Sequence, residues 1–177
     1  MKDENRPVIQ MERAIYLPLV VILTAAAIYD AKYRKIPNIL TLSAIVAGLA
    51  YHSLLSGFQG FLFSLGGAFL GMGLLIVFYL MGKMGAGDVK LMGAVGSVLG
   101  PAGVFNAFLF TGIVGGIYAI IILLYKGRFA ESMNRIWQAL KLTVLTHSPM
   151  APDEKKTGPV LCYGIAIAFG TSLSMVF

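Results

Sequence analysis

Six runs of apolar residues, separated by four short breaks and one long loop, limit which structures this chain can form. They cover residues 14–29, 39–56, 58–81, 89–99, 104–125 and 160–177. A membrane-spanning helix needs about 20 apolar residues, each adding about 1.5 Å of length, and four of the runs meet or approach that length. Because a bilayer offers the backbone no water to bind, such runs fold there as helices. The pattern predicts an all-α membrane protein with six transmembrane helices in a single domain, residues 1–177.

The composition agrees with a membrane protein and excludes other classes. Apolar residues make up 58% of the chain and charged residues only 12%, whereas soluble domains average about 45–50% and about 25%. The net charge of +6 is therefore interpreted as a signal of membrane topology, and no nucleic-acid partner is expected. The single cysteine, Cys162, can form neither an internal disulfide nor a CxxC zinc site. No metal ion or organic cofactor is indicated.

The short fourth run leaves two arrangements open. Its 11 residues would cover only about 17 Å as a helix. The tetrapeptide Gly100-Pro101-Ala102-Gly103, which separates it from the fifth run, is a strong turn signal. The alternative is one long helix that is kinked at Pro101, which would leave five spanning helices.

The distribution of basic residues favours six helices. In that arrangement the loops 30–38, 82–88 (with Lys90 just beyond) and 126–159 share one face and carry eleven of the 14 Lys and Arg residues. The opposite face has only Lys2, Arg6 and Arg13. Because cytoplasmic loops are enriched in Lys and Arg, these three loops are predicted to face the cytoplasm and both termini to face outward. With five helices, the basic residues would be divided between the faces.

The N-terminal run could alternatively belong to a cleaved signal peptide. Ala25-Ala26-Ala27 resembles a small-residue cleavage site. However, Asp3, Glu4 and Glu12 cancel the positive charges before the run, and cleavage would require the orientation that the loop charges oppose. Residues 14–29 are therefore interpreted as a spanning helix.

An amphipathic helix is predicted at the cytoplasmic face, between the fifth and sixth spanning helices. Its apolar face would carry Phe129, Met133, Ile136, Trp137, Leu140 and Val144. Its polar face would carry Arg135, Gln138 and Lys141, so the helix is expected to lie in the membrane interface.

Glycines spaced four residues apart predict close contacts between spanning helices. The pairs are Gly67 and Gly71, Gly96 and Gly100, and Gly112 and Gly116. Small residues at this spacing let helix backbones approach one another in lipid.

Two of the eight acidic residues, Asp30 and Asp88, adjoin apolar runs, and the predicted topology places both at one face. Either alone could be structural, Asp30 as an interfacial residue after a helix and Asp88 as a helix N-cap. Yet ionisable groups beside hydrocarbon are costly, and these two stand at matching ends of short helices. A hydrolase of the aspartyl class needs such a pair, because an ionised carboxylate takes a proton from water while a protonated one polarises a carbonyl.

Other catalytic schemes lack their parts. The two histidines are His52, predicted roughly 25 Å from the aspartates along its helix, and His147 in the large loop. The sequence contains no GxSxG, HExxH or GxxxxGK[ST] motif. Serine triads, zinc proteases and P-loop enzymes are therefore not expected.

Two motifs surround the aspartates. The segment from Gly85 to Lys90 (GAGDVK) resembles the GxGD motif of intramembrane aspartyl proteases. The segment from Asp30 to Asn38 (DAKYRKIPN) resembles the D-x5-[IL]-P-N signature of the type IV prepilin peptidases, and Tyr163–Ala168 is similar to the last helix of that family. The resemblance implies that Asp30 and Asp88 are catalytic, with Gly85, Gly87, Lys90, Pro37 and Asn38 in supporting roles.

This resemblance implies an aspartic endopeptidase of the bacterial inner membrane. Such an enzyme removes the short basic leader from prepilin-like proteins at the cytoplasmic face, after a glycine that precedes the hydrophobic N-terminal helix of the substrate. The short form resembles the enzymes of tight-adherence (Flp) pilus systems. Long members carry a CxxC-containing extension associated with N-methylation, which this sequence lacks, so methyltransferase activity is not expected. Prepilin substrates and membrane lipid are the implied partners.

The alternative class is a small, non-enzymatic membrane carrier. Asp30 and Asp88 would then form a proton or cation site. Carriers are typically built from internal repeats, and none is visible in this sequence.

Overall fold

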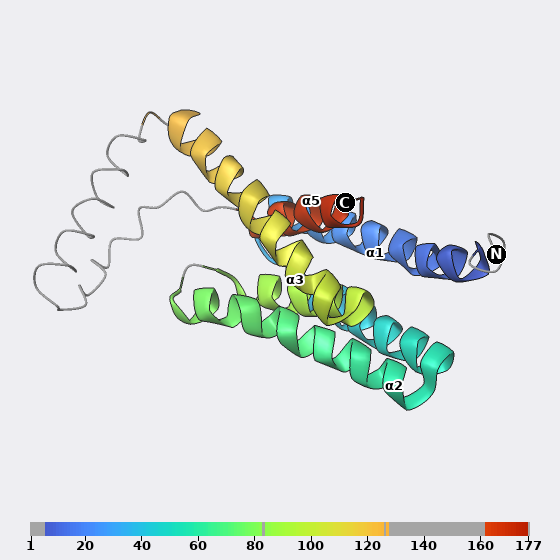
Figure 1. Ribbon diagram of the computed structural model, residues 1–177. Coiled ribbons are helices and arrows are strands. Elements are labelled where there is room, and N and C mark those ends of the chain that lie inside the picture. The colour runs from blue at the N-terminus through green and yellow to red at the C-terminus, as the bar shows by residue number, and fades with distance from the viewer. Residues whose placement is uncertain (1–5, 83, 126, 128–161, 177) are drawn as a thin grey trace, which may run out of the picture. The chain divides into compact units, whose positions relative to one another are not determined.

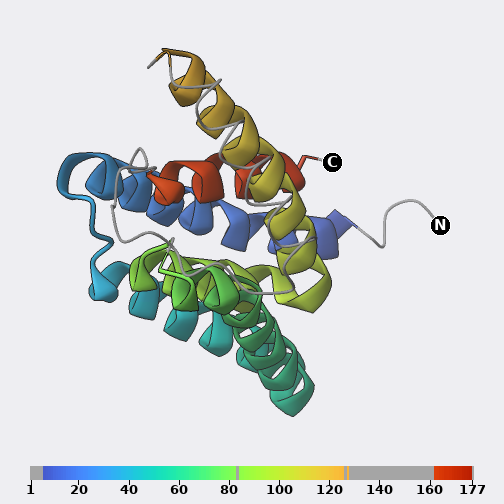
Figure 2. The same cartoon turned by 90° about the vertical axis from the view of Figure 1, so that its left-hand side faces the viewer.

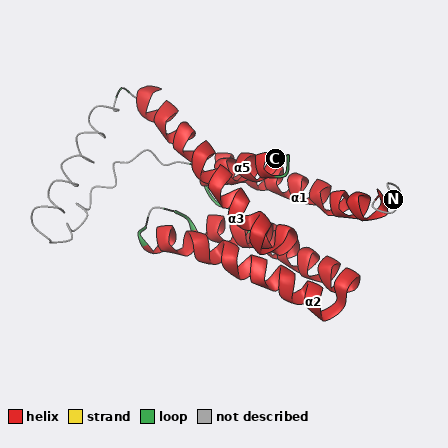
Figure 3. Cartoon of the chain, in the orientation of Figure 1, coloured by secondary structure: helices red, strands yellow, loops and turns green. Residues whose placement is uncertain are grey.

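The computed structural model describes residues 6–82, 84–125, 127 and 162–176, and within these ranges all regular structure is helical (Figures 1 and 3). The helices are α1 (Arg6–Tyr33), α2 (Asn38–Leu80), α3 (Ala86–Tyr125) and α5 (Tyr163–Ser174). Three helical segments are long and apolar enough to cross a membrane, namely Ile15–Tyr33, Asn38–Leu80 and Ala86–Ile122. An all-α protein with membrane-spanning helices is therefore confirmed.

The chain forms two compact units, residues 1–115 with 162–177, and residues 116–161. All contacts considered below lie in the first unit. In the second unit the described residues are the last turns of α3 and Gly127. The predicted amphipathic helix between Phe129 and Val144 lies outside the described residues.

Both α2 and α3 are interrupted inside a predicted break between apolar runs. In α2 the helix breaks at Ser56 and Gly57, where Gly57 has a φ of +58°, and the chain turns back on itself (Figure 1). In α3 it breaks at Gly100, with a φ of +71°, directly before Pro101. Glycine adopts positive φ without the steric cost that other residues pay, and proline lacks the N–H that would continue the helix. Each long helix thus consists of two arms.

Helices α1 and α3 extend beyond the predicted apolar runs. Helix α1 begins at Arg6, whereas the run was predicted to begin at residue 14. The first run was expected to end at residue 29, but α1 continues to Tyr33, so Asp30 lies in its final turns. The fourth run was expected to begin at residue 89, but α3 begins at Ala86 and includes Asp88 in its first turn. In contrast, α5 is shorter than the predicted run 160–177 and comprises 12 residues.

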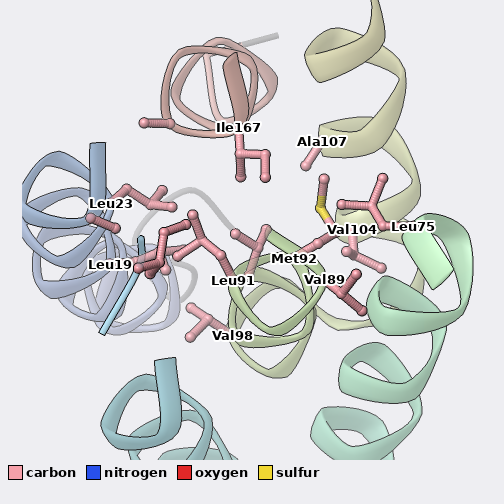
Figure 4. Close-up of a cluster of buried hydrophobic side chains, with 14 residues drawn as sticks. Leu19, Leu23, Leu75, Val89, Leu91, Met92, Val98, Val104, Ala107 and Ile167 are labelled. Carbon is pink, nitrogen blue, oxygen red and sulfur yellow. The ribbon is translucent and has the colours of Figure 1, made fainter. Parts of the chain in front are cut away.

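The core of the first unit lies between α1, α3 and α5, and one arm of α2 contributes Leu75 (Figure 4). Leu23, Leu91, Met92 and Ile167 are among its fully buried side chains. Helix α5 lies along α1 in both views (Figures 1 and 2). By contrast, many large apolar side chains on the outside of the unit are exposed, as expected for a surface that faces lipid.

Candidate active site

The two aspartates lie at the ends of buried helical stripes. In α1 the stripe consists of Leu19, Leu23, Ala26 and Asp30, and in α3 of Asp88, Leu91, Val95 and Val98; all eight side chains are buried. Their spacing of three or four residues places the members of each stripe on one helix face. Packing of the two apolar stripes into the common core brings the ends of α1 and α3 together.

Asp30 and Asp88 line the same cavity, which has a volume of about 220 Å³. Each is only 8% exposed. The other lining residues come from the α1–α2 loop, the beginning of α2 and the beginning of α3 with the residue before it; they are Arg34, Lys35, Ile36, Asn38, Gly85, Ala86 and Gly87. The structure thus brings together both predicted catalytic residues and three of the predicted supporting residues.

Asp88 is held by the start of its own helix. Its Oδ2 accepts a hydrogen bond of 3.1 Å from the backbone N–H of Gly85, and its own N–H donates to the Gly85 carbonyl at 3.1 Å. A carboxylate that reaches back in this way satisfies one of the N–H groups that a helix start leaves unpaired. Asp88 therefore stabilises the start of α3 from within the first turn, not from the N-cap position that was the structural alternative, and it also lines the cavity.

Asp30 is held by a different helix. Its Oδ2 accepts a buried hydrogen bond of 3.0 Å from the backbone N–H of Gly164, the second residue of α5. The sequence resemblance included Gly164 but assigned it no role. The contact joins residues 134 positions apart in the chain.

The loop between α1 and α2 packs against the start of α3. Ile36 is 9% exposed, and a Cβ placed on Gly87 would lie only 3.1 Å from its Cβ. Lys90 donates a hydrogen bond of 3.0 Å from Nζ to Oδ1 of Asn38, the first residue of α2. Pro37 precedes that helix in an extended conformation. Lys90 thus contacts Asn38, another of the predicted supporting residues, and this bond joins the starts of α3 and α2.

Arg34 is a feature of this loop that the sequence did not indicate. Its N–H donates to the carbonyl of Asp30 at 2.8 Å, which closes the last turn of α1, and its φ is +53°. A non-glycine residue in this left-handed region carries strain of about 1–2 kcal/mol. The strained residue lines the cavity beside both carboxylates.

Comparison with known families assigns the chain to one of them. Residues 17–120, more than half of the chain, match the family model described as the type IV leader peptidase family. The chain belongs to the type IV leader peptidase family. The matched segment includes both aspartates and the loop, whereas Gly164 lies beyond its end. No curated protein and no solved structure matches the chain.

The larger cavity of this leader peptidase family member, about 750 Å³, is separate from the aspartates. It is lined by residues of α1, α2 and α3, among them Tyr51, His52 and Gln59, and by neither Asp30 nor Asp88. His52 Nε2 lies 2.9 Å from the carbonyl oxygen of Val98, close to the break in α3. His52 thus contacts the end of the first arm of α3. There the interruption of the helix removes the usual hydrogen-bond partner of the Val98 carbonyl. Among the described residues, no group of three or more His, Cys, Asp or Glu residues could hold a metal ion.

Proposed function

We propose that this protein is a membrane aspartyl endopeptidase that removes the short basic leader from Flp-like type IV prepilins. Cleavage takes place at the cytoplasmic face, after a glycine that precedes the hydrophobic helix of the substrate. The observation that carries the proposal is the pairing of two buried carboxylates, from α1 and α3, in one cavity. Membership of the leader peptidase family supports a substrate of the prepilin type.

The aspartate pair (Asp30 and Asp88) would act by general acid–base catalysis. This chemistry requires one carboxyl group of the pair to be ionised and the other to be protonated. The ionised member accepts a proton from water, whose oxygen then forms a bond to the scissile carbonyl carbon, while the protonated member donates to the carbonyl oxygen. The carbon–nitrogen bond then breaks, and the leaving amine takes up a proton from the pair.

The cavity beside the pair is the expected place for the substrate backbone. Gly85 lines it without a side chain, whereas the space next to Gly87 is filled by Ile36. We therefore expect an extended substrate segment to approach the carboxylates past Gly85. Arg34 and Lys35 on the other side of the lining would keep the site polar where the substrate leaves the membrane.

The test is cleavage of a prepilin leader by membranes that contain Asp30→Asn or Asp88→Asn. The asparagine side chain keeps the shape of aspartate, and its amide oxygen can still accept the bonds from Gly164 and Gly85. Both variants should therefore insert and accumulate, yet cleave at least a hundredfold more slowly, because general acid–base catalysis contributes about 10²–10⁴ in rate.

Matched acid-to-amide changes serve as controls. Glu131→Gln and Asp153→Asn alter acids that do not adjoin an apolar run, and both should retain near-normal cleavage. Processing close to that of the unmodified protein by either Asp30→Asn or Asp88→Asn would refute the assignment. If the protein were a carrier, neither the unmodified protein nor any variant would cut the leader. Asp30→Asn and Asp88→Asn would instead lose proton or cation flux in vesicles.

A further inference from the structure

The N-terminus of α5 and the carboxylate of Asp30 fit each other closely. The Gly164 N–H donates to Oδ2 of Asp30 at 3.0 Å, and both residues are buried. Just before Gly164, the Cys162 sulfur lies 4.0 Å from the Asp30 backbone carbonyl. The side chain of Asp30 therefore contacts Gly164 in α5, and its backbone carbonyl contacts Cys162 directly before this helix.

Glycine is required at position 164 by the closeness of this approach. A Cβ placed there would lie 2.9 Å from Oδ2, 3.0 Å from Cβ and 3.2 Å from Cγ of Asp30. The 2.9 Å contact cannot persist without movement, and at the two longer distances Asp30 or α5 must shift by a few tenths of an ångström. Any residue other than glycine would thus displace the carboxylate or push α5 away from α1.

The contact between Asp30 and Gly164 also stabilises the N-terminus of α5. Among the described residues, Cys162 at the N-cap position gives this helix no side-chain capping bond. The first N–H groups of a helix need acceptors, and the positive end of the helix dipole favours an anion. Asp30 supplies both from a neighbouring helix, so the carboxylate and the start of α5 stabilise each other.

We propose that Gly164 is a positioning residue, whose backbone N–H fixes the orientation of the Asp30 carboxylate relative to Asp88. This inference rests on the proposed function and extends the site to a helix outside the segment that matches the family. Asp88 is positioned by its own helix, through Gly85, whereas Asp30 depends on α5. The correct arrangement of the pair therefore requires α5 to be docked.

The first experiment compares Gly164→Ala with Gly170→Ala in leader cleavage and in thermal unfolding. Gly170 is a matched control, because it is also a buried glycine of α5, but its Cβ would meet Thr111 of α3 at 2.5 Å and not the aspartates. Gly164→Ala should lower kcat about ten- to a hundredfold and leave KM nearly unchanged, because small misplacements of a catalytic group cost that much. Gly170→Ala should lower the unfolding temperature, but it leaves the contact between Gly164 and Asp30 at the other end of α5, so kcat in the folded fraction should fall much less than in Gly164→Ala.

A second experiment needs no activity and uses the single cysteine as a probe. In Asp30→Asn the amide oxygen can still accept the Gly164 bond, whereas Asp30→Ala removes the acceptor. The α5 start should then open more often in Asp30→Ala, and alkylation of Cys162 should become about three- to thirtyfold faster than in Asp30→Asn, the range expected for losing one helix cap.

Two results would overturn the inference. One is a Gly164→Ala protein with normal kcat while Asp30→Asn is inactive, and the other is equal alkylation of Cys162 in Asp30→Ala and Asp30→Asn. Failure of the proposed function would look different. The unmodified protein would then cleave no leader, yet the difference in Cys162 alkylation would persist.

Discussion

Lys90 and Asn38 show how single residues hold the site without belonging to the aspartate pair. The 3.0 Å hydrogen bond between them joins the beginning of α3 to the beginning of α2, next to the cavity. Asn38 lines that cavity and follows directly on the packed Ile36-Pro37 segment. The bond therefore keeps the loop that follows Asp30 close to the helix that carries Asp88.

A double-mutant cycle tests this role. Lys90→Met and Asn38→Ala should each slow leader cleavage about two- to tenfold, as expected when one exposed, charge-assisted hydrogen bond is lost. Because both changes remove the same bond, the double variant should be no slower than the more affected single variant. If the double variant were slower by the product of the two single effects, Lys90 would act on the substrate independently of Asn38.

The chemistry of the residues decided which of them could be predicted. Asp30 and Asp88 could be proposed from the sequence because acids beside apolar runs are rare and costly. Gly164 could not, because it is one of 21 glycines in a membrane-type composition and its partner lies 134 residues away. The positive φ of Arg34 could not be predicted from the sequence either, since arginine has no preference for that conformation.

At the scale of helices, the breaks were easier to predict than the ends. Gly57 and the Gly100-Pro101 pair predict the two helix breaks, because glycine and proline favour backbone conformations that interrupt a helix. The ends of α1 and α3 were misplaced because the apolar runs stop at Asp30 and Asp88, whereas the hydrogen bonding of the helices does not. Asp88 in fact accepts a bond at the helix start, which lets a polar residue lie within the first turn.

Three glycines at the contact between α2 and α3, namely Gly67, Gly71 and Gly96, let the arms of these helices approach closely; we call this contact the glycine seam. A Cβ on Gly67 would clash with the carbonyl oxygen of Gly96, and a Cβ on Gly96 would clash with that of Gly67. A Cβ on Gly71 would likewise meet the Met92 carbonyl. Two of the three predicted glycine pairs thus lie in a helix contact. Gly112 and Gly116 differ, since a Cβ on either would meet nothing within 4 Å among the described residues.

Substitution by alanine should reveal the seam in the free energy of unfolding. Gly67→Ala adds a methyl group to a closed contact, and overpacking of this kind costs about 1–3 kcal/mol. Gly73→Ala is the control in the same helix, because nothing lies within 4 Å of its added Cβ among the described residues. It should be neutral or stabilising by up to about 1 kcal/mol, since alanine favours helices. Denaturant titration in detergent measures both, and equal stability of the two variants would contradict the seam.

For the molecule as a whole, composition alone predicted the class, because a chain with 58% apolar residues cannot cover a soluble core. It could not predict which helix supports which carboxylate. That depends on the contact of α5 with α1 and on the common core with α3, which involve residues far apart in the sequence. Periodicity identifies the buried face of each helix but not the helix that will cover it.

The arrangement of the chain across the membrane gives the last prediction. Eleven of the 14 Lys and Arg residues lie in loops that six spanning helices would place at one face, which should therefore be cytoplasmic. Ser56 and Ala102 lie at the breaks of α2 and α3, are exposed, and should reach the opposite face. In a Cys162→Ala background, cysteine at either position should react with an impermeant maleimide on intact cells, whereas cysteine at Ser148 should react only after the membrane is opened.

If α3 instead crossed the membrane once, as a kinked helix, position 102 would lie in hydrocarbon and fail to react from either side. Reversed labelling of all three positions would put the aspartate pair outside, where it could not meet a leader that is still in the cytoplasm.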